Sequence, residues 1–274
     1  MKSKKIVIII AIVVILIVGV VLAYIKVIKP HTEAVNEYNA VVKVVKDKNK
    51  ELDDKIDALN KLIDSGDKVI DESVVDLAKE TTKKATANKL IVKDMPKKTD
   101  EIKKETEKLS TPPDYTDIIK ELDEVYEAYD ISIRQYKQLT NPSEEFVLQR
   151  LLKVDEIKAA RAVTEDHDPN GQLHKPGGYT SAVYFESKNV KQKKVLGKNL
   201  IDKGTDAGGS IEVYASEEDA NKRNSYLATF DGSFLASGSH RVIGTVVVRT
   251  SDYLSASKQK ALEQKIIDEF IKLD

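Results

Sequence analysis

The sequence contains no cysteine. This absence excludes disulfide bonds, thiol catalysis, cysteine zinc sites and lipid attachment through a cysteine. Its four histidines are too few for a histidine-rich metal protein. The net charge is −1, so no basic surplus indicates a nucleic-acid partner, and we expect none. These absences leave few routes to catalysis, and we predict that the protein is not an enzyme.

Glycine is scarce in one part of the chain and frequent in another. Between Pro30 and Ala162 there is one glycine, whereas ten glycines follow Ala162. This break in composition predicts three parts. They are a cytoplasmic tail and transmembrane anchor (residues 1–29), a helical stalk or bundle (residues 30–162) and an α+β module (residues 163–274).

Residues 6–25 form an unbroken run of twenty uncharged residues. A helix of that length spans about 30 Å, the thickness of the hydrocarbon core of a membrane. The alternative is a cleaved signal peptide with its cleavage site at residues 21–23. Because a removable apolar core has about 7–15 residues, this longer run favours an uncleaved anchor that binds the protein to the membrane.

The lysines on the two sides of the apolar run predict its orientation. Three of them precede the run and two follow it closely: Lys2, Lys4 and Lys5, then Lys26 and Lys29. This bias favours a cytoplasmic N-terminus. We therefore predict a single-pass protein of the cell membrane with its C-terminal region outside the cytoplasm.

A heptad pattern begins soon after the anchor. Its positions are separated alternately by four and three residues: Tyr38, Val42, Val45, Asn49, Leu52, Ile56, Leu59 and Ile63. Such a seam is typical of a coiled coil, where a buried asparagine at position 49 would fix register and strand number. The alternative is an asparagine turned to solvent. The seam also predicts a contact for a partner protein or for self-association.

Further helices are expected between this seam and the module. The patterns predict a helix at about residues 68–94, a short charged segment after Pro96, a helix opened by residues 111–114, and a helix over 144–162 with Ser143 as its N-cap. Their apolar stripes indicate an elongated all-α bundle or coiled-coil stalk.

The C-terminal part has the pattern of a small α+β domain. Strands are expected at residues 179–185, 210–214 and 242–249, and helices at 216–230 and 255–273. The predicted order is β-β-α-β-α. A right-handed crossover follows if the strands that flank the first of these helices are parallel.

Three stretches of this part carry a resemblance: AVTEDHDPNGQLHKPGGYTSAVYF, GTDAGGSIEVYASEEDANKRNSYLATFDG and LASGSHRVIGTVVVRTS. They resemble an uncharacterised C-terminal module of membrane-anchored proteins and lipoproteins of Gram-positive bacteria. The resemblance covers residues 163–274 and not the stalk. It implies a bacterial surface protein and assigns no functional residue.

A loop within EDHDPNG has the first half of a calcium-binding pattern. Asp166, Asp168 and Asn170 alternate, so their oxygens would converge on one Ca²⁺ ion, and Gly171 follows where an EF-hand turns sharply. The twelfth position is Gly177 instead of glutamate, and a strand follows instead of a helix. An EF-hand is therefore excluded. A calcium loop of another kind and a simple polar hinge remain as alternatives.

Other residues give weaker indications of chemistry. Ser237, Ser239, His240 and Asp231 contain the residue types of a hydrolase triad, without a nucleophile-elbow pattern. His167 and His174 lack zinc spacing. The glycines of residues 204–213 precede a strand, so we expect a turn into an edge strand and no phosphate loop.

Together these patterns predict a membrane-anchored protein that presents a small binding or sensing module on a helical stalk. One alternative is a cell-envelope hydrolase that uses the His240 loop. Another is a purely structural spacer or assembly scaffold.

Overall fold

A computed structural model describes residues 2–233 and 238–273 of the chain. The chain divides into two compact units, which are Met1–Gly66 with Val75–Glu127, and Asp67–Val74 with Ala128–Asp274. The predicted boundary near residue 163 therefore lies inside the second unit. The reason is that residues just before this boundary pair with a strand that follows it.

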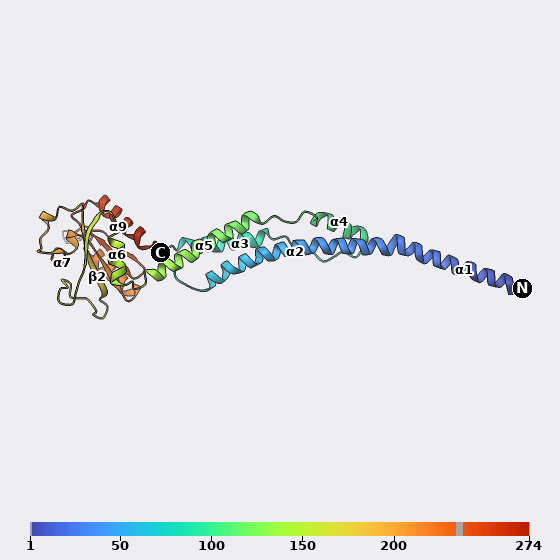
Figure 1. The fold of residues 1–274 in the computed structure, drawn as a ribbon, viewed down its shortest axis with the longest axis horizontal. Coiled ribbons are helices and arrows are strands. Elements are labelled where there is room, and N and C mark those ends of the chain that lie inside the picture. Colours follow the sequence, from blue (N-terminus) through green and yellow to red (C-terminus); the bar gives the residue numbers. More distant parts are fainter. Residues whose placement is uncertain (1, 234–237, 274) are drawn as a thin grey trace. The chain divides into compact units, whose positions relative to one another are not determined.

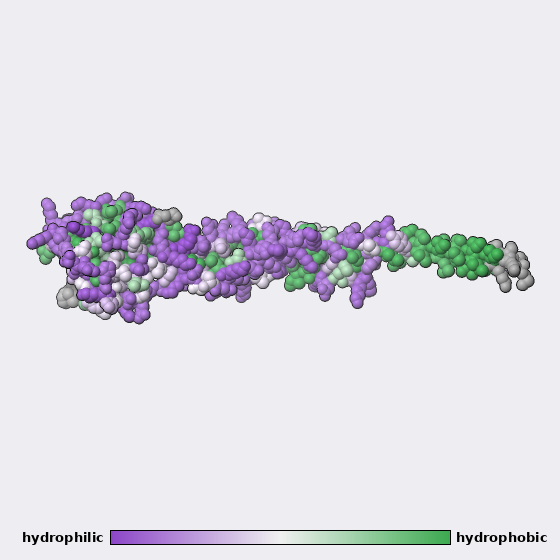
Figure 2. All heavy atoms as spheres, turned by 60° about the horizontal axis from the view of Figure 1, so that its bottom comes forward, coloured by the Kyte–Doolittle hydropathy of each residue, from purple (hydrophilic) through white to green (hydrophobic). Residues whose placement is uncertain are grey.

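The first unit begins with a continuous run of helix. α1 (Lys2–Ala23) leads through the π-helical turn η1 (Tyr24–Ile28) into α2 (Lys29–Asp64). Among the described residues, this run is the one helix long and apolar enough to cross a membrane, with a mean hydropathy of 3.4 in its most apolar stretch. The side chains of that stretch are exposed and form the green surface of α1 in Figure 2.

Pro30 accounts for the π-helical turn. Proline has no N–H, so the carbonyl of Lys26 loses the hydrogen bond that an α-helix would give it. In the turn before Pro30, the Lys29 N–H donates to the carbonyl of Tyr24, five residues back, and not to that of Ile25, four residues back. The helix thus continues past the apolar run, with a local change of hydrogen-bond register.

The seam predicted for residues 38–63 is buried by the chain itself. The buried residues of α2 include six of its positions: Tyr38, Val42, Val45, Leu52, Ile56 and Leu59. Ile102 and Leu109 of α4 (Thr99–Leu109) pack against the part of the seam nearest α1. Much of the apolar stripe is therefore packed within the chain itself.

Most of α3 (Ser73–Asn88) and the first half of α5 (Thr116–Gln138) also belong to this unit, and Figure 1 shows both helices beside α2. Ion pairs join their exposed faces: Lys55 of α2 to Asp123 of α5 at 2.7 Å, and Lys84 of α3 to Glu121 at 2.6 Å. Exposed pairs of this kind contribute little stability, so burial of the apolar stripes holds the bundle together.

The predicted helix over residues 68–94 is too long at both ends. α3 ends at Asn88, and residues 89–98 run without regular structure to α4. Ile91, which falls within the predicted helix, is 80% exposed. The chain leaves the helix because the backbone of Leu90 bonds to side chains of other elements.

Asn49 makes these bonds together with Tyr115. The Asn49 amide donates to the Leu90 carbonyl at 2.8 Å, and the Tyr115 hydroxyl donates to the Asn49 carbonyl oxygen at 2.8 Å. The Leu90 N–H in turn donates to the Tyr115 oxygen at 2.8 Å. Asn49 therefore neither faces solvent nor sets the register of a second helix, because it closes a polar knot within one chain.

Replacing Asn49 by leucine is expected to destabilise the first unit by about 1–3 kcal/mol, since partly buried groups of Leu90 and Tyr115 lose their partner. Urea denaturation of the full chain in detergent micelles measures the change. The matched Asn36→Leu variant alters an exposed residue of α2 and should stay within about 0.5 kcal/mol of the parent. Equal stability of the two variants would contradict this role.

The second unit is built on a five-stranded antiparallel sheet with the order β1-β2-β3-β5-β4. The strands are β1 (Ile157–Ala162), β2 (Tyr179–Ser187), β3 (Gly208–Tyr214), β4 (His240–Ile243) and β5 (Val246–Thr250). The helices are α6 (Glu144–Leu151), the short α7 (Leu200–Lys203), α8 (Glu217–Ala228) and α9 (Ala256–Phe270). This unit also contains two short 3-10 helices, η2 (Gln192–Lys194) and η3 (Gly204–Ala207).

Alternation along the strands separates two cores. Val183, Ile211 and Val248 point to one face, in a core that includes residues of α6 and α9. Tyr184 and Val247 point to the other face, in a core that includes residues of α7 and α8. Successive residues of a strand therefore point to opposite faces of the sheet, and both faces are covered.

Several predicted elements of this unit are confirmed with small shifts of their ends. The strands expected at 179–185 and 210–214 are β2 and β3, and the helices expected at 216–230 and 255–273 are α8 and α9. Ser143 caps α6 by accepting a hydrogen bond from the Phe146 N–H, as predicted. The coarse description of a helical part followed by a small α+β part holds.

Two elements were predicted wrongly. The helix expected over 144–162 ends at Leu151, and residues 157–162 form β1, because pairing with β2 overrides the helix propensity of an alanine-containing segment. The single strand expected over 242–249 is a hairpin, in which Gly244 turns the chain with φ of +57°. The order of the main elements is thus β-β-β-α-β-β-α.

The hairpin also removes the expected parallel crossover. β3 lies beside β5, and the two are antiparallel. The chain leaves β3 through α8, enters the sheet at the edge strand β4 and returns through β5. Residues 208–214 are therefore a central strand, not the edge strand that the glycine-rich stretch suggested.

Candidate functional site

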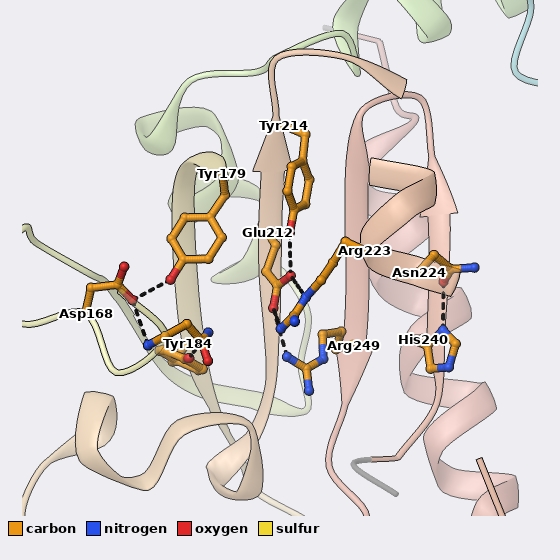
Figure 3. A network of polar contacts seen from close by, with 10 residues as sticks. Asp168, Tyr179, Tyr184, Glu212, Tyr214, Arg223, Asn224, His240 and Arg249 are labelled. Atoms are coloured by element: carbon orange, nitrogen blue, oxygen red, sulfur yellow. Dashed lines mark hydrogen bonds and ion pairs between the residues drawn. The ribbon is translucent and has the colours of Figure 1, made fainter. Parts of the chain in front are cut away.

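The predicted calcium loop is held by hydrogen bonds. The Asp168 carboxylate accepts the backbone N–H groups of Asn170 (3.1 Å), Gln172 (2.7 Å) and Leu173 (2.9 Å). It also accepts the Tyr179 hydroxyl, as Figure 3 shows. These donors surround the oxygens that a cation would use. The geometry therefore favours a polar turn tied to the sheet.

The remaining members of the predicted calcium set do not converge with Asp168. The Asn170 amide donates to the Tyr184 hydroxyl at 3.1 Å, and Asp166 is exposed. Among the described residues, no group of three or more histidines and acidic residues could hold a metal ion. Calcium binding by Asp166, Asp168 and Asn170 stays a prediction that no observation supports.

Ionisation follows the same contacts. Burial alone would raise the pKa of Asp168, but the Tyr179 hydroxyl and the backbone N–H groups outweigh it and lower this pKa. Burial and the bond to Asp168 raise the pKa of Tyr179. The carboxylate is therefore charged and the phenol is neutral at ordinary pH.

The described residues of the hydrolase alternative, Ser239, His240 and Asp231, do not form a serine–histidine pair. Nδ1 of His240 lies 2.7 Å from Asn224 Oδ1, and its Nε2 lies 3.3 Å from Asp231 Oδ1. The Ser239 hydroxyl lies 2.7 Å from the Thr250 hydroxyl. Both nitrogens of His240 are engaged elsewhere, so neither is placed to take a proton from Ser239. Ser237 lies outside the described residues.

His167 and His174 also have separate surroundings. His167 Nε2 lies 2.8 Å from Asp202 Oδ1, while the His174 backbone N–H donates to the Tyr179 carbonyl at 2.9 Å. Neither contact brings the two imidazoles to a common ligand.

The strongest cluster of charges lies on the sheet face that α8 covers. Glu212 of β3 is 1% exposed, and its carboxylate accepts two bonds from Arg223 of α8, at 2.7 and 2.9 Å. Arg249 of β5 donates at 2.8 Å and Tyr214 at 2.9 Å. Figure 3 shows this carboxylate between the two guanidinium groups. Two arginines thus share one buried acid.

The pattern of β3 explains why these groups meet. Ser210, Glu212 and Tyr214 are alternate residues, and they face the same side of the sheet as α8. Burial alone would raise the pKa of Glu212, but the bonds and charges of Arg223 and Arg249 outweigh it and lower this pKa. The charged state is therefore the stable one in the fold.

A hollow of about 460 Å³ opens beside this cluster. We call it the arginine cleft. The residues that define it are two guanidinium groups, one ammonium group and three aromatic rings: Arg223, Arg249, Lys203, Tyr184, Tyr226 and Phe230. Arg223 lies over the Tyr226 ring at 5.6 Å, and Tyr226 meets Phe230 edge to face at 5.1 Å. The cleft thus combines cationic groups with an apolar wall.

Ser210 lies below this cleft in the sheet. It is paired in register with Tyr184 on one side and Arg249 on the other. The residue is 1% exposed, and its hydroxyl has no hydrogen-bond partner among the residues that the structure describes. A buried hydroxyl of this kind carries a cost, and a ligand or a water molecule would relieve it.

The sequence contains a signal for this cluster. Glu212 is the one charged residue of the strand SIEVY, and Arg249 ends the apolar run of β5. A charged residue on a buried strand must meet a partner or a ligand. Arg223 could not be selected, because α8 carries several other charged residues.

Comparison of the chain with protein-family models, with curated proteins and with solved structures found no match. The resemblance of residues 163–274 to a module of Gram-positive surface proteins therefore stays a prediction. Functional arguments for this chain come from its own geometry.

Proposed function

We propose that the chain is a single-pass membrane protein whose α+β domain binds a small anionic ligand in the arginine cleft. The observation that carries this proposal is the sharing of one carboxylate by Arg223 and Arg249 beside a hollow with aromatic walls. A guanidinium group has five N–H donors, and Arg223 uses two of them for Glu212, so it can donate to an anion as well.

The charges around the cleft support an anion. Among the residues that line the cleft, together with the carboxylate bonded to its arginines, the positive side chains are Arg223, Arg249 and Lys203 and the negative ones are Glu212 and Asp206, so the sum is 3 − 2 = +1. Burial, and then nearby Asp252, raise the pKa of Asp206. Its charge is lost first as the pH falls, and anion binding should therefore tighten towards acid pH.

The membrane part of the proposal depends on the apolar helix. Its most apolar stretch is unburied and long enough to span a bilayer. The lysine bias favours a cytoplasmic N-terminus, with the second unit outside the cytoplasm. In a Gram-positive bacterium, which the resemblance implies, the cleft would face the cell surface and could bind or sense a solute there.

The two alternatives gain no support from the geometry. A hydrolase would need a nucleophile beside His240, whose ring nitrogens face Asn224 and Asp231. An assembly scaffold would need a free seam on α2, and that seam is buried within the chain.

The proposal predicts a specific stabilisation by small anions. The probes are inorganic phosphate and benzoate, each compared with chloride at equal ionic strength in thermal melts of the full chain in detergent. A ligand at about 100 times its Kd stabilises by about 2.7 kcal/mol. We expect the Arg223→Gln variant to lose at least about tenfold in affinity, or about 1.4 kcal/mol.

The Arg241→Gln variant is the matched control, since Arg241 bonds to Gln264 and does not line the arginine cleft. It should keep the full shift. A shift with benzoate but not with phosphate would indicate that the aromatic wall contributes to binding. Shifts that are absent for both probes, or equal in the two variants, would contradict the proposed site.

A further inference from the structure

Residues 89–99 run along α2 in the direction of α1. The Leu90 carbonyl bonds to Asn49, the Lys93 carbonyl accepts the Tyr38 hydroxyl at 2.9 Å, and Thr99 Oγ1 lies 3.0 Å from His31 Nδ1. Each later residue thus contacts an earlier position of α2. Eighteen helical residues rise about 27 Å, which nine extended residues also cover.

The chain then reverses. α4 starts at Thr99 and returns along α2, with Ile102 and Leu109 packed in the core that contains Ala34 and Tyr38. Residues 95–98 are therefore the turning point between the descending and returning segments. We call them the α4 tip. Within the first unit, they lie beside the start of α2, close to His31.

The depth of this tip follows from the helix rise. His31 comes six residues after Ile25, the last residue of the apolar run, which is a rise of about 9 Å. The headgroup layer of a bilayer adds about 5–7 Å to each side of the hydrocarbon core. If α1 fills that core, the α4 tip lies at the outer border of the headgroups.

The side chains of the tip suit such a surface. Met95 is 42% exposed, and Lys97 and Lys98 are exposed. Lys98 pairs with Glu101 at 3.1 Å, but both side chains are solvated, so this pair is weak and free to exchange. Long lysine stems carry their ammonium groups towards phosphate oxygens.

We propose that the α4 tip rests on the phospholipid headgroups of the bilayer that α1 crosses, with Lys97 and Lys98 at phosphate oxygens and Met95 at the interface. This second contact rests on the proposed membrane anchor. It would limit tilting of the helical unit, because the bundle then touches the membrane at α1 and at the tip.

The acidic neighbours define what kind of contact this is. Residues 93–101 contain three lysines and three acids, a net charge of 3 − 3 = 0. Asp100 and Glu101 lie in the first turn of α4, where the helix dipole stabilises them. The contact therefore depends on the position of the lysines at phosphate groups, and not on a surplus of anionic lipid.

The absence of cysteine allows a direct test. A polarity-sensitive fluorophore is attached to a Met95→Cys variant of the full chain in phosphatidylcholine vesicles, with quenching by a spin label on the lipid headgroup. We expect blue-shifted emission and strong quenching at position 95. Adding Lys97→Glu and Lys98→Glu should reduce the quenching, because the phosphate oxygens repel the carboxylates that replace the two ammonium groups.

Two further positions separate the possible failures. A Lys61→Cys variant carries the label on the exposed far part of α2, about 45 Å beyond His31, and should show no quenching. A Val20→Cys variant reports whether α1 itself is in the bilayer. Quenching at 20 without quenching at 95 would overturn the α4 tip contact alone, whereas none at 20 would overturn the anchor and the contact with it.

Discussion

Replacing Glu212 by glutamine is expected to destabilise the second unit by about 3–5 kcal/mol. Glutamine keeps the shape of the side chain but removes its charge. Arg223 and Arg249 then stay in a desolvated place without the carboxylate that they share. Breaking a buried ion pair from one side costs far more than the net contribution of the intact pair, because the remaining charge loses its compensation.

The effect should depend on pH with a defined sign. The pKa of Glu212 is lower in the fold than in the unfolded chain, so its contribution is fully present above the unfolded pKa of about 4.3. It is lost as the pH falls through the lower folded pKa. The difference between the parent and Glu212→Gln should therefore be constant near neutral pH and shrink in acid.

Urea denaturation at a series of pH values measures both quantities, followed by near-UV circular dichroism, to which tyrosines of both units contribute. The control is Glu218→Gln on α8, where the glutamate side chain is 77% exposed and pairs with Lys222. That variant should change stability by less than about 0.5 kcal/mol. A Glu212→Gln variant as stable as this control would contradict the shared-carboxylate account.

The double substitution Val13→Arg and Ile17→Arg is expected to release the chain from membranes. Each arginine at the centre of a membrane helix costs about 2.5–3.5 kcal/mol, so the pair costs about 5–7 kcal/mol. The two positions lie on adjacent turns near the middle of the apolar run, and their like charges offer each other no relief.

Fractionation of cells and carbonate extraction measure this release. The matched control is Val13→Leu with Ile17→Leu, which keeps the apolar run and should stay in the membrane pellet. The α+β domain of the released protein should retain its anion-dependent stabilisation, because the arginine cleft lies in the other unit. Equal membrane retention of the two double variants would contradict an anchor formed by α1.

Local patterns were sufficient where one element buries one stripe. The α2 seam and the helices α8 and α9 were predicted because apolar spacing and caps such as Ser216 act within a few residues. The patterns could not assign the partner of the seam. Whether it meets a second chain or residues 99–109 of the same chain depends on contacts far apart in sequence.

The errors arose where long-range pairing decided the structure. Residues 157–162 have the composition of a helix and become β1 because β2 offers a free edge. The apolar run of residues 242–249 predicts one strand, but Gly244 divides it, and the left-handed φ of this glycine provides the turn. Extended residues after Asn88 are likewise fixed by Asn49 and Tyr115, which lie elsewhere in the sequence.

The candidate site shows the same limit. The EDHDPNG loop was noticed because its residue types are adjacent, and its Asp168 proves to bind backbone N–H groups and a tyrosine. The arginine cleft was not predicted, since Glu212, Arg223 and Arg249 come from three elements. Only the sheet order brings β3 and β5 together beneath α8.

The orientation of the second unit across the membrane is the central claim. Thiol labelling of intact cells tests it, because the chain has no cysteine of its own. Two variants carry one thiol each, Ser257→Cys at an exposed position in the first turn of α9 and Ser3→Cys in the N-terminal tail. With a membrane-impermeant maleimide, we expect labelling at position 257 in intact cells and at position 3 only after lysis. Labelling at position 257 only after lysis would contradict this orientation, whether position 3 reacts in intact cells or not.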